Sequence, residues 1–157
     1  EGSYNDIDII CTDEIGNVSL SFRISQFTID LTPPEVNSSK LIFSSTEELD
    51  PGINNTNAIQ FYSQSLQPKF EFTPDTDCTF TITSVNFPTL TFTKDTGMPD
   101  ITDTITGGSL MRIIFDTLTM NTEYKDFKLN LTDSYGNLKS HNIAQFEIDN
   151  TSPTGFG

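Results

Sequence analysis

Carboxylates are the side chains that this sequence offers in sufficient number for chemistry. The chain has 22 Asp and Glu residues against 8 Lys and Arg, and its formal net charge is −14 at pH 7. Clustered carboxylates can bind calcium, which takes about six to eight oxygen ligands at one site. Asp is also favoured in turns, where its side chain hydrogen-bonds to the nearby backbone. Which role an Asp takes depends on the residues that the fold brings next to it.

Nucleophilic and acid–base catalysis have weak support in the sequence. The only histidine is His141, which stands between Ser140 and Asn142, and a hydrolytic triad would also need a nucleophile and an orienting carboxylate. No nucleophile elbow, phosphate-binding loop or Cys/His metal spacing is present. Two-carboxylate hydrolysis stays open, because Asp and Glu are abundant. We expect no enzyme activity, and we expect His141 to be an ordinary surface residue.

The clearest element is a β-hairpin over residues 124–153. Phe127, Leu129 and Leu131 alternate with polar residues, and this period of two predicts a half-buried strand. A turn follows at 133–137, where Gly and Asn tolerate a positive φ. The returning strand carries three apolar residues, which are Ile143, Phe146 and Ile148.

The same hairpin pattern opens the chain at residues 4–33. Four elements recur with an offset of 120, and a Phe on the returning strand recurs with an offset of 119. These matches indicate an internal repeat. We therefore divide the sequence into the hairpin and linker of a preceding module at 1–33, a complete module at 34–152, and the start of the next linker at 153–157. The matched elements are Tyr4 with Tyr124, Asp6 with Asp126, Asp13 with Asp133, Gly16-Asn17 with Gly136-Asn137, and Phe27 with Phe146.

Three motifs carry a resemblance to a known class of module. They are Leu-x5-Tyr at 118–124, Thr-Asp-x-x-Gly-Asn at 12–17 and 132–137, and Phe-x-Ile-Asp-x-Thr at 27–32 and 146–151. The chain resembles the tandem immunoglobulin-like or fibronectin-III-like modules of microbial surface proteins, of the adhesin, fibre or surface-layer type. The resemblance implies an all-β antiparallel sandwich of about seven strands.

The resemblance also implies that Tyr124 is a corner tyrosine, whose hydroxyl bonds back to the backbone before the sixth strand. In both copies the next apolar strand residue comes three positions after the Tyr, where fibronectin-like patterns place it two positions after. Either a bulge follows Tyr124, or the corner lies one residue away.

Other segments with period-two alternation or short apolar runs complete the predicted sandwich. We expect a long connection at 44–67 with a turn at 47–52. The expected core residues are Phe70, Phe72, Phe80, Leu129 and Leu131. The expected strands before the hairpin lie at 36–43, near 59–62, from 68 through 72, at 78–84, around Leu90 and Phe92, and at 110–116.

The two cysteines do not suggest a bridge within one domain. Cys11 occupies the position that Leu131 takes in the second copy, and Cys78 falls on a predicted strand. We expect both to behave as small buried hydrophobic residues, with an inter-chain disulfide as the alternative.

Placing the carboxylates on this topology predicts a cation site between modules. The linker and several Asp-bearing loops share one pole of the complete module, and the preceding hairpin brings further Asp residues to this junction. Such charges would repel one another unless a cation lay between them, and calcium accepts these ligands. No EF-hand spacing is present, and solvated acidic loops are the alternative. The expected ligands are Asp6, Asp30, Asp75, Asp77 and Asp133.

The acidic balance argues against nucleic acid and anionic lipid as partners, because both would repel this chain. No apolar run is long enough for a membrane-spanning helix. We expect an extracellular or cell-surface protein, as the resemblance implies. Because no signal-like segment is present, we expect a processed form or an excerpt. Candidate glycosylation sites are Asn17, Asn37, Asn54, Asn130 and Asn150.

The leading functional hypothesis is a non-enzymatic structural repeat module of an extracellular fibre, adhesin stalk or surface layer, with calcium stiffening the junction. Its partners would be further copies of the module, in tandem or as filament subunits. The alternative is a carbohydrate- or protein-binding module that uses the loops at one pole. A third class is a domain appended to a glycosidase, which would differ from the other two only by the sequence context outside this chain.

A hairpin at 1–30 without its other strands would expose apolar residues such as Ile7, Ile9 and Phe22. Lone hairpins are marginally stable in water. Either the missing strands lie upstream in a longer array, or the hairpin completes an incomplete sandwich in a neighbouring subunit. The complete module already has its own last two strands, which counts against the second explanation.

Overall fold

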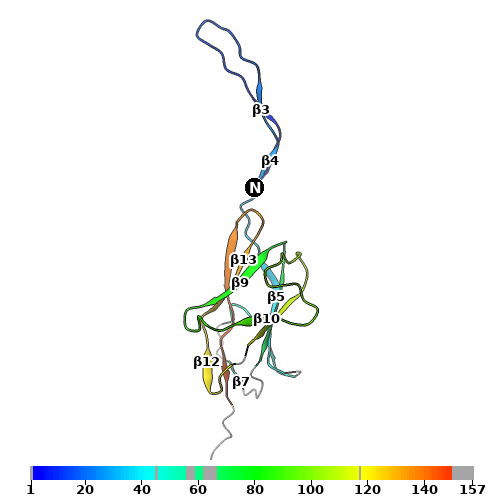
Figure 1. Ribbon diagram of the computed structural model, residues 1–157, viewed down its shortest axis with the longest axis vertical. Coiled ribbons are helices and arrows are strands. Elements are labelled where there is room, and N and C mark those ends of the chain that lie inside the picture. The colour runs from blue at the N-terminus through cyan, green and yellow to red at the C-terminus, as the bar shows by residue number, and fades with distance from the viewer. Residues whose placement is uncertain (1, 45, 56–58, 62–66, 117, 150–157) are drawn as a thin grey trace, which may run out of the picture. The chain divides into compact units, whose positions relative to one another are not determined.

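The computed structural model describes the chain apart from residues 1, 45, 56–58, 62–66, 117 and 150–157 (Figure 1). The described residues contain strands, turns and bends, and none of them lies in a helix. Accordingly, the described part has no helix long and apolar enough to cross a membrane. The all-β prediction is therefore confirmed. The chain divides into two compact units, Glu1–Thr32 and Pro33–Gly157.

The first unit is a β-hairpin that is interrupted once along its length. Its outer pair is β1 (Gly2–Tyr4) with β4 (Phe27–Ile29), and its inner pair is β2 (Ile7–Ile9) with β3 (Phe22–Ile24). Both pairs are antiparallel, with Tyr4 opposite Phe27 and Ile9 opposite Phe22. The predicted hairpin in this part of the sequence is confirmed.

The second unit contains one five-stranded and two three-stranded sheets among its described residues. Their orders are β10-β11-β8-β5-β6, β14-β13-β9 and β12-β15-β7. All strand pairs are antiparallel except β15 with β7. The strands are β5 (Val36–Ile42), β6 (Glu48–Leu49), β7 (Ile59–Phe61), β8 (Lys69–Pro74), β9 (Thr79–Ser84), β10 (Phe92–Lys94), β11 (Met111–Phe115), β12 (Thr122–Tyr124), β13 (Phe127–Thr132), β14 (Leu138–Asn142) and β15 (Phe146–Ile148).

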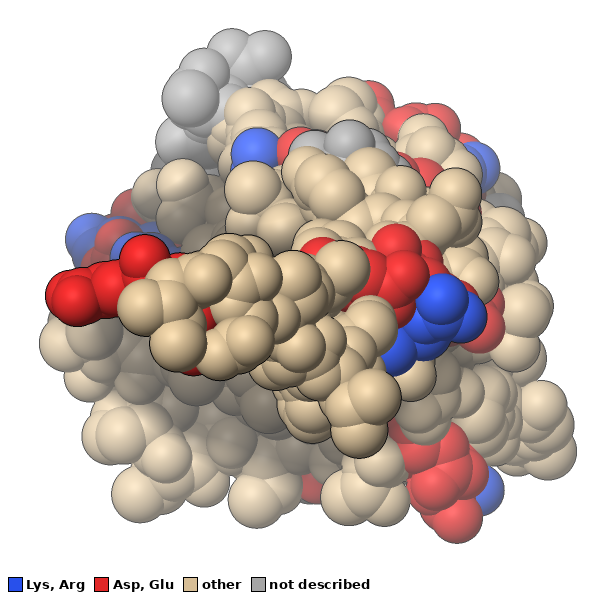
Figure 2. Space-filling model, turned by 90° about the horizontal axis from the view of Figure 1, so that it is seen from above, with Lys and Arg blue, Asp and Glu red and all other residues tan. Residues whose placement is uncertain are grey.

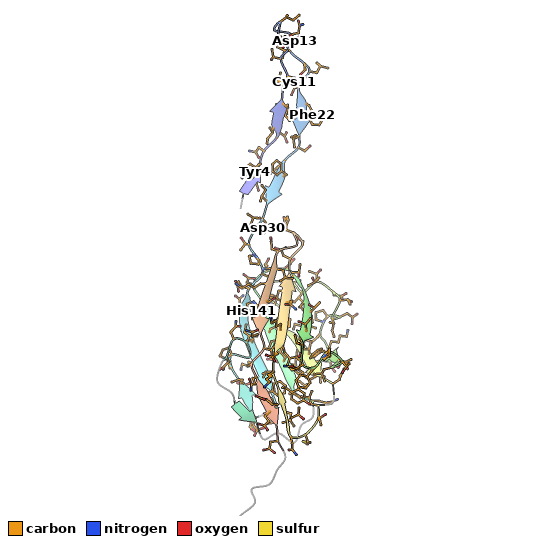
Figure 3. The ribbon with its side chains drawn as sticks, turned by 90° about the vertical axis from the view of Figure 1, so that its left-hand side faces the viewer. Tyr4, Cys11, Asp13, Phe22, Asp30 and His141 are labelled. Carbon is orange, nitrogen blue, oxygen red and sulfur yellow. The ribbon has the colours of Figure 1, made fainter. Side chains whose placement is uncertain are left out.

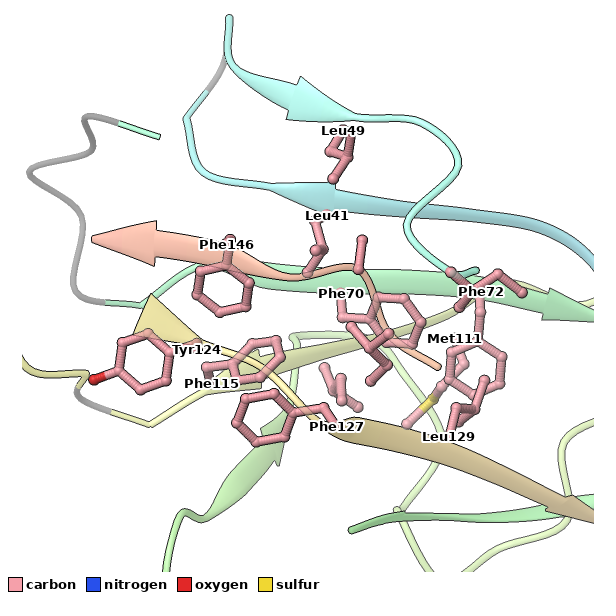
Figure 4. Packing of buried hydrophobic residues seen from close by; sticks show 14 of the residues in the cluster. Leu41, Leu49, Phe70, Phe72, Met111, Phe115, Tyr124, Phe127, Leu129 and Phe146 are labelled. Carbon is pink, nitrogen blue, oxygen red and sulfur yellow. The ribbon is translucent and has the colours of Figure 1, made fainter. Parts of the chain in front are cut away.

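Side chains from these sheets meet in one Phe-rich core (Figure 4). Strand β8 shows how period-two alternation builds this core. Phe70 and Phe72 are buried, while Glu71 between them is only half-buried. Rings from different sheets also meet, as Phe72 and Phe80 do at a centroid distance of 5.2 Å. The five core residues expected from the sequence, including Leu129 and Leu131, are all buried. The architecture is consistent with a β-sandwich.

The structure has more strand segments than the seven expected. The turn predicted at 47–52 contains the short strand β6, which pairs with β5 at Leu49 opposite Leu41. The long last strands are each broken into two. Between β12 and β13, Asp126 takes a φ of 62°, which no regular strand contains. Of the two alternatives left open by the spacing after Tyr124, this break agrees with an irregularity directly after the Tyr.

Tyr124 fixes the chain where it enters the hairpin. Its ring is buried, its hydroxyl accepts a hydrogen bond from the N–H of Thr119 at 2.6 Å, and it lies 3.3 Å from the Thr119 carbonyl, to which it donates. The expected bond from this hydroxyl back to the preceding backbone is therefore present. The ring also stacks on Phe146 at a centroid distance of 5.3 Å.

The two hairpins offer a matched test of where stability comes from. Leu129 is fully buried, whereas Ile9, its counterpart in the first copy, is 44% exposed. Leu129→Ala should lower the free energy of unfolding of the second unit by about 2–5 kcal/mol, because it leaves a cavity in the core. Ile9→Ala should change it by less than about 0.5 kcal/mol. Urea denaturation measures both, and equal effects would contradict the assigned core.

Candidate functional site

The Asp-x-x-Gly-Asn turn of the first hairpin is held together by one carboxylate. Asp13 Oδ1 accepts hydrogen bonds from the backbone N–H groups of Ile15 at 3.0 Å and Asn17 at 2.8 Å. Asp13 Oδ2 accepts another from Asn17 Nδ2 at 2.8 Å. Gly16 takes a φ of 90°, which a residue with a Cβ rarely adopts. The side-chain bond from Asn17, followed by its backbone bond, lowers the pKa of Asp13.

The turn of the second hairpin repeats this arrangement bond for bond. Asp133 Oδ1 accepts from the N–H groups of Tyr135 at 2.8 Å and Asn137 at 2.9 Å, and Oδ2 accepts from Asn137 Nδ2 at 2.9 Å. Gly136 takes a φ of 87°. Burial opposes ionisation of Asp133, but the bonds from Asn137, Tyr135 and Gly136 outweigh it and lower its pKa. Both Asp residues therefore act as turn-forming acceptors.

Asp6 and Asp30, the two predicted ligands that lie in the first unit, are also engaged locally. Asp6 Oδ1 accepts a hydrogen bond from the N–H of Gln26 at 3.0 Å, and Asp6 Oδ2 lies 3.5 Å from Arg23 Nη1. Asp30 Oδ1 accepts from the N–H of Thr32 at 3.0 Å. The ion pair with Arg23 offsets the charge of Asp6, and the two backbone hydrogen bonds orient the carboxylates of Asp6 and Asp30 within the first unit.

In the second unit, Asp75 and Asp77 fasten loops. Asp75 Oδ1 accepts a hydrogen bond from the N–H of Glu35 at 2.8 Å, and Asp77 Oδ1 accepts one from the N–H of Gly107 at 2.8 Å. Gly107 is needed at this place, because a Cβ there would lie 2.7 Å from the Thr76 backbone.

The charges of Asp75, Asp77 and Asp133 all act on one buried thiol, that of Cys78. Burial raises the pKa of the Cys78 thiol, and these three charges raise it further, to about 11. Among the residues that the structure describes, no group of three or more His, Cys, Asp or Glu side chains is placed to hold a metal ion. On the face shown in Figure 2, acidic side chains form several separate groups.

The two cysteines differ in environment. Cys78 is buried, as expected, and the high pKa of its thiol makes it unreactive at neutral pH. Cys11 is exposed, so the prediction that it is buried is wrong. Its counterpart Leu131 is covered because Phe80 of β9 lies opposite it, and no such strand lies beside Cys11 among the described residues of the first unit.

His141 is buried, which corrects its assignment as a surface residue. Its Nδ1 lies 3.4 Å from Asn54 Nδ2, its Nε2 lies 3.7 Å from Glu35 Oε2, and within the described residues Nε2 has no hydrogen-bond partner. Burial lowers the pKa of His141, Glu35 opposes this effect, and Lys139 adds to it. No hydroxyl or thiol accompanies the imidazole in these contacts, so they contain no nucleophile–base pair.

Sequence signals for this burial exist. His141 is two residues before the buried Ile143 on a period-two strand, and its counterpart in the first hairpin is Phe22.

A cavity of about 530 Å³ lies beside the edge strand β9. Strand β9 pairs with β13 on one side, and the described residues place no strand on its other side. The sequence had no feature that predicted this cavity, because its lining joins β9 to a distant strand and loop. The lining residues are Thr79, Phe80, Thr81, Ile82, Phe92, Ile101 and Thr102.

The candidate glycosylation sites differ in their accessibility. Asn37 is exposed on β5. The side chains of Asn17 and Asn54 are exposed but engaged with Asp13 and His141, respectively. The Asn130 amide lies between Ser140 and two threonines of β9. Asn150 and the predicted linker at 153–157 lie outside the described residues.

The burial of His141 predicts a loss of stability in mild acid. The pKa of an unfolded His is about 6.5 and that of folded His141 is lower, so unfolding takes up a proton below that pH. The stability that neutral His141 confers is therefore present above about pH 6.5 and is lost as the pH falls toward the folded pKa. His141→Phe, which introduces the residue found at position 22, should flatten this loss.

Urea unfolding between pH 5 and 8 measures that effect. Ser140→Ala is the matched control, because Ser140 is the exposed neighbour on the same strand, and it should keep the wild-type slope. Identical slopes for wild type and His141→Phe would show that His141 does not control the pH dependence.

Calcium binding at the junction stays a prediction from the sequence. It can be tested with substitutions that keep the hydrogen bonds of the loops. Asp75 and Asp77 each accept a backbone bond that an Asn side chain can also accept, so Asp75→Asn and Asp77→Asn remove charge while keeping that bond. If calcium binds, millimolar calcium should raise the Tm of chelator-treated protein, and both substitutions should reduce this increase. A Tm that does not change with calcium would show that Asp75 and Asp77 serve only to form their loops.

Comparison with known proteins places the chain in no group. No family model, no curated protein and no solved structure matches it. A function therefore has to be argued from the duplicated hairpin and the fold that contains its second copy.

Proposed function

We propose that this chain is a non-enzymatic structural repeat module of an extracellular fibre, adhesin stalk or surface layer. The observation that carries the proposal is the duplication of one hairpin with the same turn, the same hydrogen bonds within that turn and corresponding cross-strand pairs. Tyr4 lies opposite Phe27 as Tyr124 lies opposite Phe146, and Thr12 lies opposite Val18 as Thr132 lies opposite Leu138. Recurrence of one supersecondary unit at a fixed period is the signature of repeat arrays.

The topology of the second unit supports an immunoglobulin-like or fibronectin-III-like module. The order β10-β11-β8-β5 fits a sheet of the fourth, fifth, second and first strands, and β9-β13-β14 fits a sheet of the third, sixth and seventh. Strand β7 runs parallel to β15, which follows β14 on the returning side of the hairpin and pairs with β12 in a separate sheet. The Tyr124 hydroxyl fits the corner tyrosine of such modules.

The polar groups that recur between the copies support a structural role. Asp13 and Asp133 both build their own turns with the same set of hydrogen bonds. These contacts shape the backbone of each turn.

The cavity beside β9 favours a second candidate function, which is binding of a carbohydrate or protein ligand. Its lining combines apolar side chains such as Ile82 and Phe92 with threonine hydroxyls, and such a mixture suits a small ligand or an extended peptide. The expected binding surface was the loops at one pole. The cavity involves one such loop, through Ile101 and Thr102, together with a strand edge.

A tandem array tests the structural role. Copies of residues 34–153 joined end to end reproduce the repeat period of 120 residues. Stretching one molecule should give equally spaced unfolding events that each release roughly 40 nm, because extended chain spans about 3.3–3.6 Å per residue. Leu129→Ala in one copy should lower the force of one event only. A single irregular extension, without repeated events, would contradict the structural module.

A further inference from the structure

The first hairpin carries an apolar surface that the described residues leave uncovered. Its cross-strand pairs Ile7–Ile24 and Ile9–Phe22 are entirely apolar, and the rings of Tyr4 and Phe27 stack at 5.1 Å. We call eight residues the apolar surface of the first hairpin: Tyr4, Ile7, Ile9, Cys11, Phe22, Ile24, Phe27 and Ile29. Figure 3 labels three of them, Tyr4, Cys11 and Phe22. Seven of them are between 39% and 68% exposed, and Cys11 is also exposed.

The polar residues of this hairpin alternate with the apolar ones except at Ile10, which is 56% exposed. Asp8 lies opposite Arg23, and Ser3 Oγ lies 3.2 Å from Thr28 Oγ1. The hairpin therefore has the two-sided pattern of a strand pair that buries one side. Exposed apolar patches of this kind mark interaction sites.

The second hairpin shows what covers this surface. The eight corresponding residues are at most 5% exposed: Tyr124, Phe127, Leu129, Leu131, His141, Ile143, Phe146 and Ile148. Their cover comes from strands that precede the hairpin in the chain. Strand β9 pairs along the outer edge of β13, and the ring of Phe115 on β11 lies 5.5 Å from those of both Phe127 and Phe146 (Figure 4).

We propose that the apolar surface of the first hairpin binds the strands β5 to β11 of another copy of this module. This inference rests on the proposed function, because the partner is a further repeat. In the resulting sandwich, the partner's third strand runs antiparallel along β2. The register of the second unit places Ile82 opposite Leu129 and Phe80 opposite Leu131. The equivalent partner residues therefore lie opposite Ile9 and Cys11.

The second unit of the same chain is not this partner. Its own hairpin already occupies the position, with Phe127, Leu129 and Phe146 fully packed. A first hairpin could bind there only by displacing β12 to β15. A preceding module that supplies strands β5 to β11 has this position open.

The side chains also define the chemistry of the partner. Cys11 and Ile7 are smaller than Leu131 and Phe127, whereas Phe22 is larger than His141. Interiors are close-packed, so the partner needs larger side chains beside Cys11 and Ile7 and a smaller one beside Phe22. The partner is thus a diverged copy, and residues 34–123 of this chain are a close substitute for it.

The reactivity of the Cys11 thiol reports directly whether the apolar surface of the first hairpin is covered. In the chain as it stands Cys11 is exposed and Cys78 is buried, so a thiol reagent such as Ellman's reagent should react quickly with one thiol only. Placing residues 34–123 directly before Tyr4 adds the proposed cover in the register of the second unit. In this extended chain we expect the reaction of Cys11 to slow at least 100-fold, because its position becomes that of Leu131.

Two variants test whether the slow reaction of Cys11 is caused by the proposed cover. Ile9→Asp in the extended chain should restore fast reaction of Cys11, because it places a charge at the centre of the covered surface. Arg23→Gln, on the polar side, should leave the protection intact. Fast reaction in the extended chain itself would overturn the proposal, and so would protection that Ile9→Asp does not affect.

Replacing residues 124–149 of the full chain by residues 4–30 is a second test. The chimera should unfold cooperatively, with a lower Tm than the parent because its side chains fit less well. A chimera without cooperative unfolding, together with fast Cys11 reaction in the extended chain, would refute the inference. Concentration-dependent protection of Cys11 in the unextended chain would show pairing between first hairpins instead, and would also overturn it.

The outcomes of these tests distinguish failure of the docking surface from failure of the proposed function. A protected Cys11 with an array that fails to show repeated unfolding would keep the docking surface and reject the structural module. Repeated unfolding of the array with a reactive Cys11 in the extended chain would keep the structural module and reject the docking surface.

Discussion

The second unit depends on the packing of its last hairpin against the strands that precede it. Phe115 lies between Phe127 and Phe146, with edge-on contacts at 5.5 Å to each, so three rings from β11, β13 and β15 form one group. Large aromatic side chains dominate the energetics of such cores. Removing the hairpin would expose the inner sides of β8, β9 and β11 together. The hairpin is therefore an integral layer of the fold.

The entry of the chain into this hairpin is controlled by Tyr124 and Asp126. The Tyr124 hydroxyl holds the backbone at Thr119, and the positive φ of Asp126 then breaks the strand. The break lets Tyr124 and Phe127 both face the core although they are three residues apart, an odd spacing that would place them on opposite sides of a regular strand. A local irregularity thus adds a ring to the core.

Period-two alternation and turn residues were enough to predict the longer strands, the two hairpins and the five core residues, but not the short strands β6 and β12. They were not enough for features that depend on what lies across from a residue. Cys11 occupies a core-type position yet is exposed, and His141 is polar yet buried beside Glu35. The acidic residues show the same limit. Asp75 bonds to a residue 40 positions away, a pairing that no local pattern specifies.

The two hairpins separate local from non-local causes of structure. The turns at Asp13 and Asp133 have matching bonds although one hairpin is covered and the other is not, so each turn is determined by its own residues. The burial of the strands differs completely, so it is determined by the rest of the module. A hairpin that keeps its register without a core is already ordered for binding. Such preorganisation lowers the conformational entropy that docking would cost, and it gives the first hairpin a shape that a preceding set of strands can recognise.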